Sequence, residues 1–209
     1  MQKAIITILI SIGTVISITA LVAVGTHAIY GTTDDTTNIF VPMNDQSTGA
    51  NATVSESPLD PDRIQIPVVH VNAHVQHVGV GKSGNMAVPT NYFDVGWFRL
   101  GSKPGQKGSA VIDGHVDNGL GSAGVFHDLN KLSRGDDIFV LNKTGDKIRF
   151  KVTEIMIVSN KDKTITQAVF SKNGNPRLTL ITCDGVWIQS ERQYDKRLIV
   201  FADLVQTNR

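Results

Sequence analysis

The sequence predicts an all-β domain, either a sandwich or a small closed barrel, and two observations carry that prediction. Short runs of alternating apolar and polar residues recur between Gly, Pro and Asn turn signals, with little helical periodicity. The first and last of these runs, which begin at Arg63 and Arg197, are both strongly hydrophobic and could pair with each other. Because that pairing would close the sheet, we favour the barrel.

The N-terminal segment predicts a membrane anchor. No charged residue lies between Lys3 and Asp34, and residues 4–24 are apolar apart from Thr, Ser and Gly. A helix of this length would cross a hydrocarbon core about 30 Å thick. Lys3 favours a cytoplasmic N-terminus, so residues 1–30 are expected to form a cytoplasmic tip and a single transmembrane helix, with the remainder outside the cell. A cleaved signal peptide is the alternative.

Residues 31–62 predict a flexible extracytoplasmic linker, because they are rich in Thr, Asn, Asp, Ser and Pro. Such a stretch cannot bury enough apolar surface to offset its chain entropy. The remaining residues, 63–209, are sufficient for one folded domain. The net charge of +1, from 20 basic and 19 acidic residues, gives no sign of a nucleic-acid surface.

The elements of the domain follow from alternation and turn signals. The first run should break near Pro67, since proline cannot donate a hydrogen bond to a sheet. Before the break Ile64, Ile66 and Val68 share one face, and after it the inward-facing positions begin at Val69. The second run ends near Val80. Further strands are predicted at 95–98, 109–114, 137–141, 147–158, 178–183 and 197–204, and short helical turns at 126–132 and 164–170.

Three histidines near the start of the domain, His70, His74 and His77, raise the question of a metal site. A metal site needs three or four converging ligands. These side chains instead coincide with the polar phase of the run, which favours ordinary solvent-facing histidines. No metal and no cofactor is predicted.

Cys183 is the only cysteine, and it lies where a predicted strand meets the turn signal Asp184-Gly185. Most free cysteines are small buried hydrophobes. Outside the cell, however, a single cysteine can form no internal disulfide, so a reactive thiol has to be considered. Acyl transfer by a thiol also needs a proton donor and a positive charge. His115, which follows an apolar strand, and an arginine of the terminal strand would supply both if the strand ends converge.

At these residues the sequence resembles the sortases, the membrane-anchored cysteine transpeptidases of bacterial surfaces. The matching pieces are Gly114-His115-Val116, a Leu-x-x-Leu-x-x-Gly-Asp-x-Ile pattern over 129–138, Thr179-Leu180-Ile181-Thr182-Cys183, and Arg197 at the start of the last strand. The resemblance spans about 64–204. The surroundings of Trp97 and Pro104-Gly105 look most like class F sortases.

The resemblance implies an eight-stranded sortase barrel with short helices and a defined chemistry. Cys183 would attack an LPXTG-like sorting signal between Thr and Gly, giving a thioacyl-enzyme. His115 would protonate the leaving amine, Arg197 would stabilise the oxyanion, and Thr182 would assist beside the thiol. The partners implied are sorting-signal proteins and an amine acceptor, either a cell-wall precursor or a pilin lysine. Arg192 is the rival arginine, but it lies in the polar loop that should follow Cys183.

The sequence also departs from parts of the family. It shows neither the acidic cluster that binds calcium in class A sortases nor the aromatic lid motif of pilus-building ones, which favours a metal-independent, unlidded enzyme. Two other functions stay open. A cysteine peptidase would let water resolve the same thioacyl intermediate, and a non-catalytic surface-binding module could keep the barrel alone. A redox-sensing thiol is less favoured, because the chain has no second cysteine to resolve it.

Overall fold

The computed structural model describes residues 57–206 of the 209-residue chain. The predicted anchor over 1–30 and most of the predicted linker over 31–62 therefore lie outside the described residues. Within 57–206, no helix is long and apolar enough to span a membrane.

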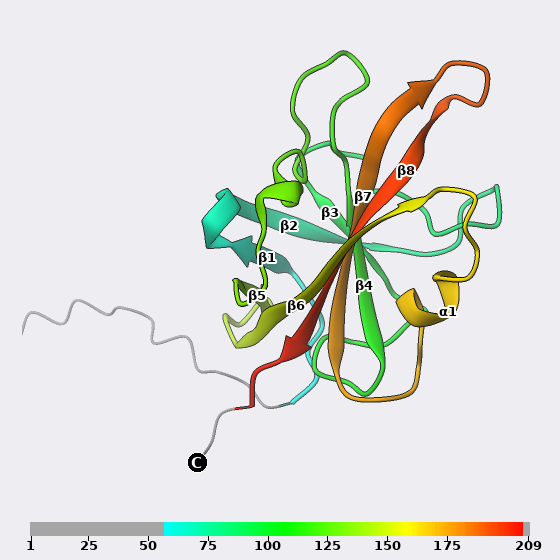
Figure 1. Ribbon diagram of the computed structural model, residues 1–209. Helices are drawn as coiled ribbons and strands as arrows, with labels where there is room; N and C mark the ends of the chain where they lie inside the picture. The colour runs from blue at the N-terminus through cyan, green and yellow to red at the C-terminus, as the bar shows by residue number, and fades with distance from the viewer. Residues whose placement is uncertain (1–56, 207–209) are drawn as a thin grey trace, which may run out of the picture. The chain divides into compact units, whose positions relative to one another are not determined.

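The described residues form a closed barrel of eight strands in the order β1-β2-β3-β4-β7-β8-β6-β5 (Figure 1). This confirms the predicted all-β barrel. In chain order the elements are β1 Arg63–Ile66, the 3-10 turn η1 Pro67–Val69, β2 Val71–Val78, β3 Val95–Phe98, β4 Ser109–Gly114, the 3-10 turn η2 Leu129–Lys131, β5 Asp137–Leu141, β6 Lys147–Ser159, α1 Thr166–Val169, β7 Arg177–Ile188 and β8 Gln193–Leu204.

The barrel does not close by pairing of its first and last strands, so that prediction was wrong. β1 pairs with β5, for example Ile64 with Val140, whereas β8 lies between β6 and β7. The reason lies in the length and burial of β8. Its stretch from Leu198 to Ala202 is buried on both faces, so it needs long partners on both sides, which β6 and β7 provide and the four-residue β1 does not.

The break near Pro67 is present as a 3-10 turn that begins at that proline and ends with His70 in the left-handed region, at φ 54°. Val69, Ala73 and Val75 are buried after it, as expected. Val68 is the exception, because it is 55% exposed. The turn rotates the chain before Val68, so this side chain leaves the inward phase to which alternation had assigned it.

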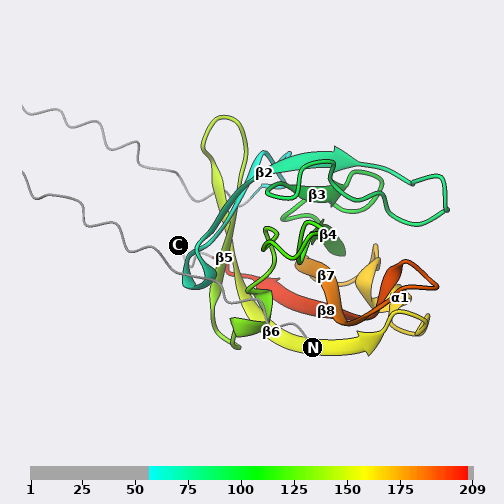
Figure 2. The ribbon, with the colours of Figure 1, turned by 90° about the horizontal axis from the view of Figure 1, so that it is seen from above.

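Two apolar clusters pack against opposite faces of the sheet formed by β4, β7 and β8. Inside the barrel lie Ile112, Leu180 and Val200, one from each strand. On the outer face, Val111 and Phe201 pack with Val169 of α1 and its neighbours. Figure 2 shows α1 beside β7 and β8. β4 runs parallel to β7, and parallel strands are usually covered on both faces. Because these three strands are packed on both faces, they hold the residues at their ends in fixed positions.

β7 does not end at Asp184-Gly185, so the predicted loop after Cys183 was wrong in part. The strand continues to Ile188 and forms a long hairpin with β8, whose register shifts between Asp184 and Trp187. Gly185 has φ +85° at that shift. The Asp-Gly signal thus marks a bulge, in which glycine supplies the positive φ, and not the end of the strand.

Candidate active site

Two of the predicted catalytic residues are direct partners on adjacent strands, and the third lies just beyond the end of the next strand. Cys183 on β7 is the direct partner of Arg197 on β8. On the other side, β4 and β7 are paired up to Asp113 and Ile181. Continued by two residues, that register would bring His115, the first residue after β4, level with Cys183, and we call His115, Cys183 and Arg197 the catalytic row. Side chains alternate along a strand, so the row lies on the same outer face as Ile181 and the cluster under α1.

Thr182 points the other way, into the barrel, where it is 4% exposed. Its hydroxyl donates a 2.8 Å hydrogen bond to the carbonyl oxygen of Gly114. The side chain expected beside the thiol therefore ties β7 to the end of β4 from the opposite face. This bond joins the residue before Cys183 to the residue before His115.

The Cys183 thiol is half-buried, and this burial raises its pKa above the ordinary value for cysteine. The positive charge of Arg197 acts in the opposite direction and lowers the pKa, whereas the carboxylates of Asp113 and Asp117 raise it. At neutral pH the side chain is consequently a thiol and not a thiolate. Forming the thiolate of Cys183 therefore requires either a base that accepts the thiol proton or positive charge that the substrate brings to the site.

His115 is held by the segment that precedes β3. Its Nε2 atom lies 2.9 Å from the carbonyl oxygen of Pro89, and its ring centroid lies 4.8 Å from that of Tyr92. Because a carbonyl oxygen only accepts, Nε2 must carry the proton in this arrangement. The ring is thereby fixed in orientation, and its Nδ1 lone pair is available when the imidazole is neutral.

Arg197 is anchored through one nitrogen of its guanidinium. Nη1 donates to the carbonyl oxygens of Tyr194 at 3.0 Å and Lys196 at 2.7 Å. An arginine carries five N–H donors, so several are left for a substrate carbonyl or an oxyanion. Arg192, the rival, is exposed at the tip of the β7–β8 hairpin with φ 51°, away from the row.

A family model for the sortase domain matches residues 64–205. The chain belongs to the sortase family. Its solved relatives share the barrel: sortase C-1 of Actinomyces oris (formerly Actinomyces naeslundii) is 27% identical, with a TM-score of 0.55 over 71% of this chain and 77% of that one. A lid mutant of sortase A from Corynebacterium diphtheriae is 23% identical, with a TM-score of 0.54 over 73% of each chain.

A sortase D5 transpeptidase of Clostridium perfringens is 24% identical, with a TM-score of 0.53 over 72% of this chain and 82% of that one. At 23% and 24% identity, the sortase A and sortase D5 structures show only that the fold is shared. No curated protein matches the sequence. The family and the barrel make this chain a sortase-type transpeptidase. The three structures are described as sortases C, A and D, so the class F assignment stays a prediction.

Sequence reasoning missed an acidic side chain in the site of this sortase. Asp113 is next to the catalytic row on the same face, and burial raises the pKa of its carboxyl to about 7. Among the described residues, its Oδ1 atom has no hydrogen-bond partner. A Cβ atom on Gly96 would lie 2.9 Å from Oδ1, so glycine at that position leaves room for the carboxyl. An acidic residue inside the apolar run 109–114 was the available signal.

The early histidines do not form a metal site. His74 lies 3.8 Å from Asp94, and His77 is 2.9 Å from the carbonyl oxygen of Pro61. Within 57–206, no group of three or more His, Cys, Asp or Glu side chains is placed to hold a metal ion.

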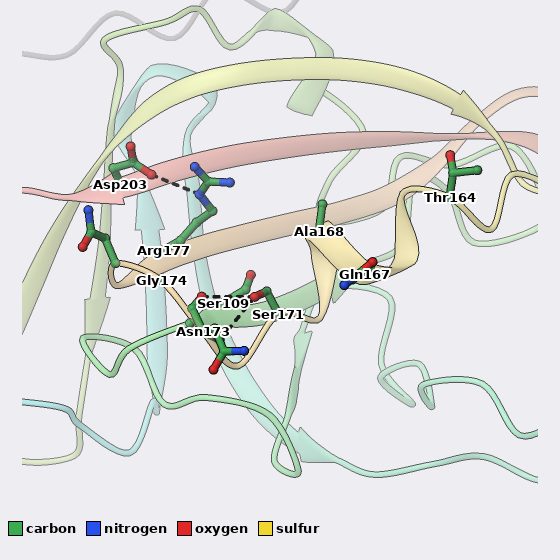
Figure 3. A pocket seen from close by; sticks show the side chains of 11 residues that line it. Ser109, Thr164, Gln167, Ala168, Ser171, Asn173, Gly174, Arg177 and Asp203 are labelled. Carbon is green, nitrogen blue, oxygen red and sulfur yellow. Dashed lines mark hydrogen bonds and ion pairs between the residues drawn. The ribbon is translucent and has the colours of Figure 1, made fainter.

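A polar pocket of about 510 Å³ lies at the other end of β4 and β7, far along these strands from the catalytic row. Figure 3 shows Arg177 reaching toward Asp203 at its edge and Ser171 beside Asn173. Deeper in the pocket, the hydroxyl of Ser109 is 2.6 Å from that of Thr179. Ser109, Ser171, Arg177 and Asp203 thus already have hydrogen-bond partners within the chain.

Proposed function

We propose that this sortase is a membrane-anchored cysteine transpeptidase that cleaves an LPXTG-like sorting signal between Thr and Gly. It then transfers the cleaved protein to an amine acceptor at the cell surface, a cell-wall precursor or a pilin lysine. The class F assignment, the anchor over 1–30, the single-pass orientation and the extracellular catalytic domain belong to the same proposal. Two observations support it: the direct pairing of Cys183 with Arg197, and the position of His115 immediately after β4, the strand that pairs with β7 on the other side.

In the first step the sulfur of Cys183 bonds to the carbonyl carbon of the sorting-signal threonine as the thiol proton passes to Nδ1 of neutral His115. The negative charge that develops on the carbonyl oxygen is stabilised by the free N–H groups of Arg197. The carbon–nitrogen bond then breaks, and the departing glycine amine receives a proton from His115. The product is a thioester between the substrate and Cys183.

In the second step the acceptor amine attacks the thioester carbon, and its excess proton passes to His115. The carbon–sulfur bond breaks and the departing sulfur of Cys183 takes this proton from His115, which restores the thiol and the neutral imidazole. A water molecule in place of the amine would give hydrolysis by the same route. The peptidase alternative therefore differs only in the acceptor.

Incubation of the full chain with an LPXTG-type peptide, with and without an amine acceptor, tests the proposal by mass spectrometry. We expect a thioacyl adduct on Cys183 and an amine-linked product that forms only with the acceptor. The Cys183→Ala variant should give neither. Cleavage that is indifferent to the acceptor would leave a peptidase, and the lack of any adduct would leave a binding module.

A further inference from the structure

Tyr194, which is not one of the three catalytic residues, forms hydrogen bonds both to the loop after β4 and to Arg197 on β8. Tyr194 lies on β8, three residues before Arg197, and is paired with Trp187 of β7. Its hydroxyl donates to the Oδ2 atom of Asp117, in the loop that follows β4 and His115. Its carbonyl oxygen accepts from Nη1 of Arg197 at 3.0 Å. In Figure 1 the β7–β8 hairpin rises beside this loop at the top of the barrel.

Both ends of this connection are themselves fixed. Asp117 accepts a 2.8 Å hydrogen bond from the backbone N–H of Gly119 through its other oxygen and forms a bridge pair with Ala123. At the other end, the carbonyl oxygen of Tyr194 also accepts from Nδ2 of Asn160 at 2.7 Å, and the tyrosine ring packs edge-on against Trp187 at 5.4 Å. Neither partner is a freely rotating surface side chain.

The charge state of the pair suits a lasting hydrogen bond. Donation to Asp117, together with burial, raises the pKa of the Tyr194 hydroxyl to about 12. The hydroxyl therefore stays protonated at every pH at which a thiol enzyme would work. The Asp117 carboxylate also raises the pKa of Cys183, which places its charge within electrostatic reach of the thiol.

The loop carries His115 and the hairpin carries Arg197, and Cys183 lies between them. We propose that Asp117 and Tyr194 are positioning residues for acyl transfer: their hydrogen bond sets the separation of His115 and Arg197 across Cys183. This inference rests on the proposed function. The proposed reaction gives Asp117 and Tyr194 no step at the scissile bond or the oxyanion, so they act through His115 and Arg197, which have those steps.

A small displacement of groups that must act together on one carbonyl slows the chemical step far more than it weakens substrate binding. Tyr194→Phe removes only the hydroxyl, and Asp117→Ala removes its acceptor. We expect each variant to lower kcat for the sorting peptide by about 10- to 100-fold with KM nearly unchanged. Rates are expressed per reactive thiol, counted by alkylation, so that a loss of folded protein does not count as a loss of catalysis.

The double variant gives the deciding measurement. If the two residues act through one hydrogen bond, Tyr194→Phe has no further effect once Asp117 is alanine, so the double variant matches Asp117→Ala. Asp137→Ala is the matched control: it removes a carboxylate of β5 that binds Arg149 and Lys151 of β6, and it should leave kcat per thiol at the parental value.

Two results would overturn the inference: a parental kcat in Tyr194→Phe, or losses that simply multiply in the double variant. Failure of the proposed function has a different signature. In that case the parent chain itself forms no thioacyl adduct with the peptide, whatever the variants do.

Discussion

The hydroxyl of Thr182 and the carbonyl oxygen of Gly114 form a 2.8 Å hydrogen bond inside the barrel, one residue away from the thiol on one strand and from the imidazole on the other. The bond joins two parallel strands one residue beyond their last paired residues, Asp113 and Ile181. It lies on the opposite face from the chemistry. The placement of the reactive side chains is thus set from behind by a buried polar contact.

Removing this bond should loosen both the fold and the site. Thr182→Val keeps the shape of the side chain but leaves the Gly114 carbonyl without its donor, which should lower the free energy of unfolding by about 1–3 kcal/mol. We also expect a lower kcat, because β4 and His115 are no longer tied to β7. Urea denaturation followed by peptide kinetics measures the two effects. Thr182→Ser, which retains the hydroxyl, is the control, and equal stability of Thr182→Val and the parent would contradict the interpretation.

Arg197 should control the ionisation of the thiol. Burial raises the pKa of Cys183 and the guanidinium of Arg197 lowers it, so Arg197→Ala should raise that pKa further. The rate of alkylation by iodoacetamide, followed against pH, should therefore move to more alkaline pH in this variant. Arg192→Ala, at the exposed hairpin tip, supplies the comparison. A profile that moves in Arg192→Ala and stays in place in Arg197→Ala would show that the wrong arginine had been assigned.

Asp113 should make the protein less stable as pH rises. Its pKa is raised by burial to about 7 in the folded chain, against about 3.9 when unfolded. Between these values the unfolded state releases a proton that the folded state retains. The stabilising contribution is therefore complete below pH about 4 and is lost as pH rises through about 7.

Asp113→Asn removes this dependence, so its free energy of unfolding should fall less than that of the parent between pH about 5 and pH about 8. Urea unfolding at the two pH values measures the difference. Asp137→Asn serves as the comparison, because hydrogen bonding to Arg149 lowers the pKa of that carboxyl and its contribution is lost toward acid pH instead. Parallel pH profiles for Asp113→Asn and the parent would refute the assignment.

The positions of the strands could be predicted because alternation and turn chemistry are local. The strand 137–141 was placed at its observed bounds, and 109–114 likewise, since each is an apolar run between glycine-containing turns. Prediction failed where the outcome depends on partners far along the chain. The Asp184-Gly185 pair is a turn signal by itself, but β8 supplies a partner strand beyond it, and Asp195 accepts from the N–H of Val186 at 2.6 Å.

The sequence by itself determined the residue types of the candidate site: one cysteine before an Asp-Gly signal, a histidine after an apolar strand, and an arginine on the terminal strand. It could also indicate the family, because these pieces occur at the family's spacing. Only the tertiary structure decided which strands are neighbours, and with it the row of His115, Cys183 and Arg197. The same long-range pairing buries Asp113, turns Thr182 away from the thiol and brings Tyr194 to Asp117. These contacts join residues up to 77 positions apart, a separation that no local pattern of side chains encodes.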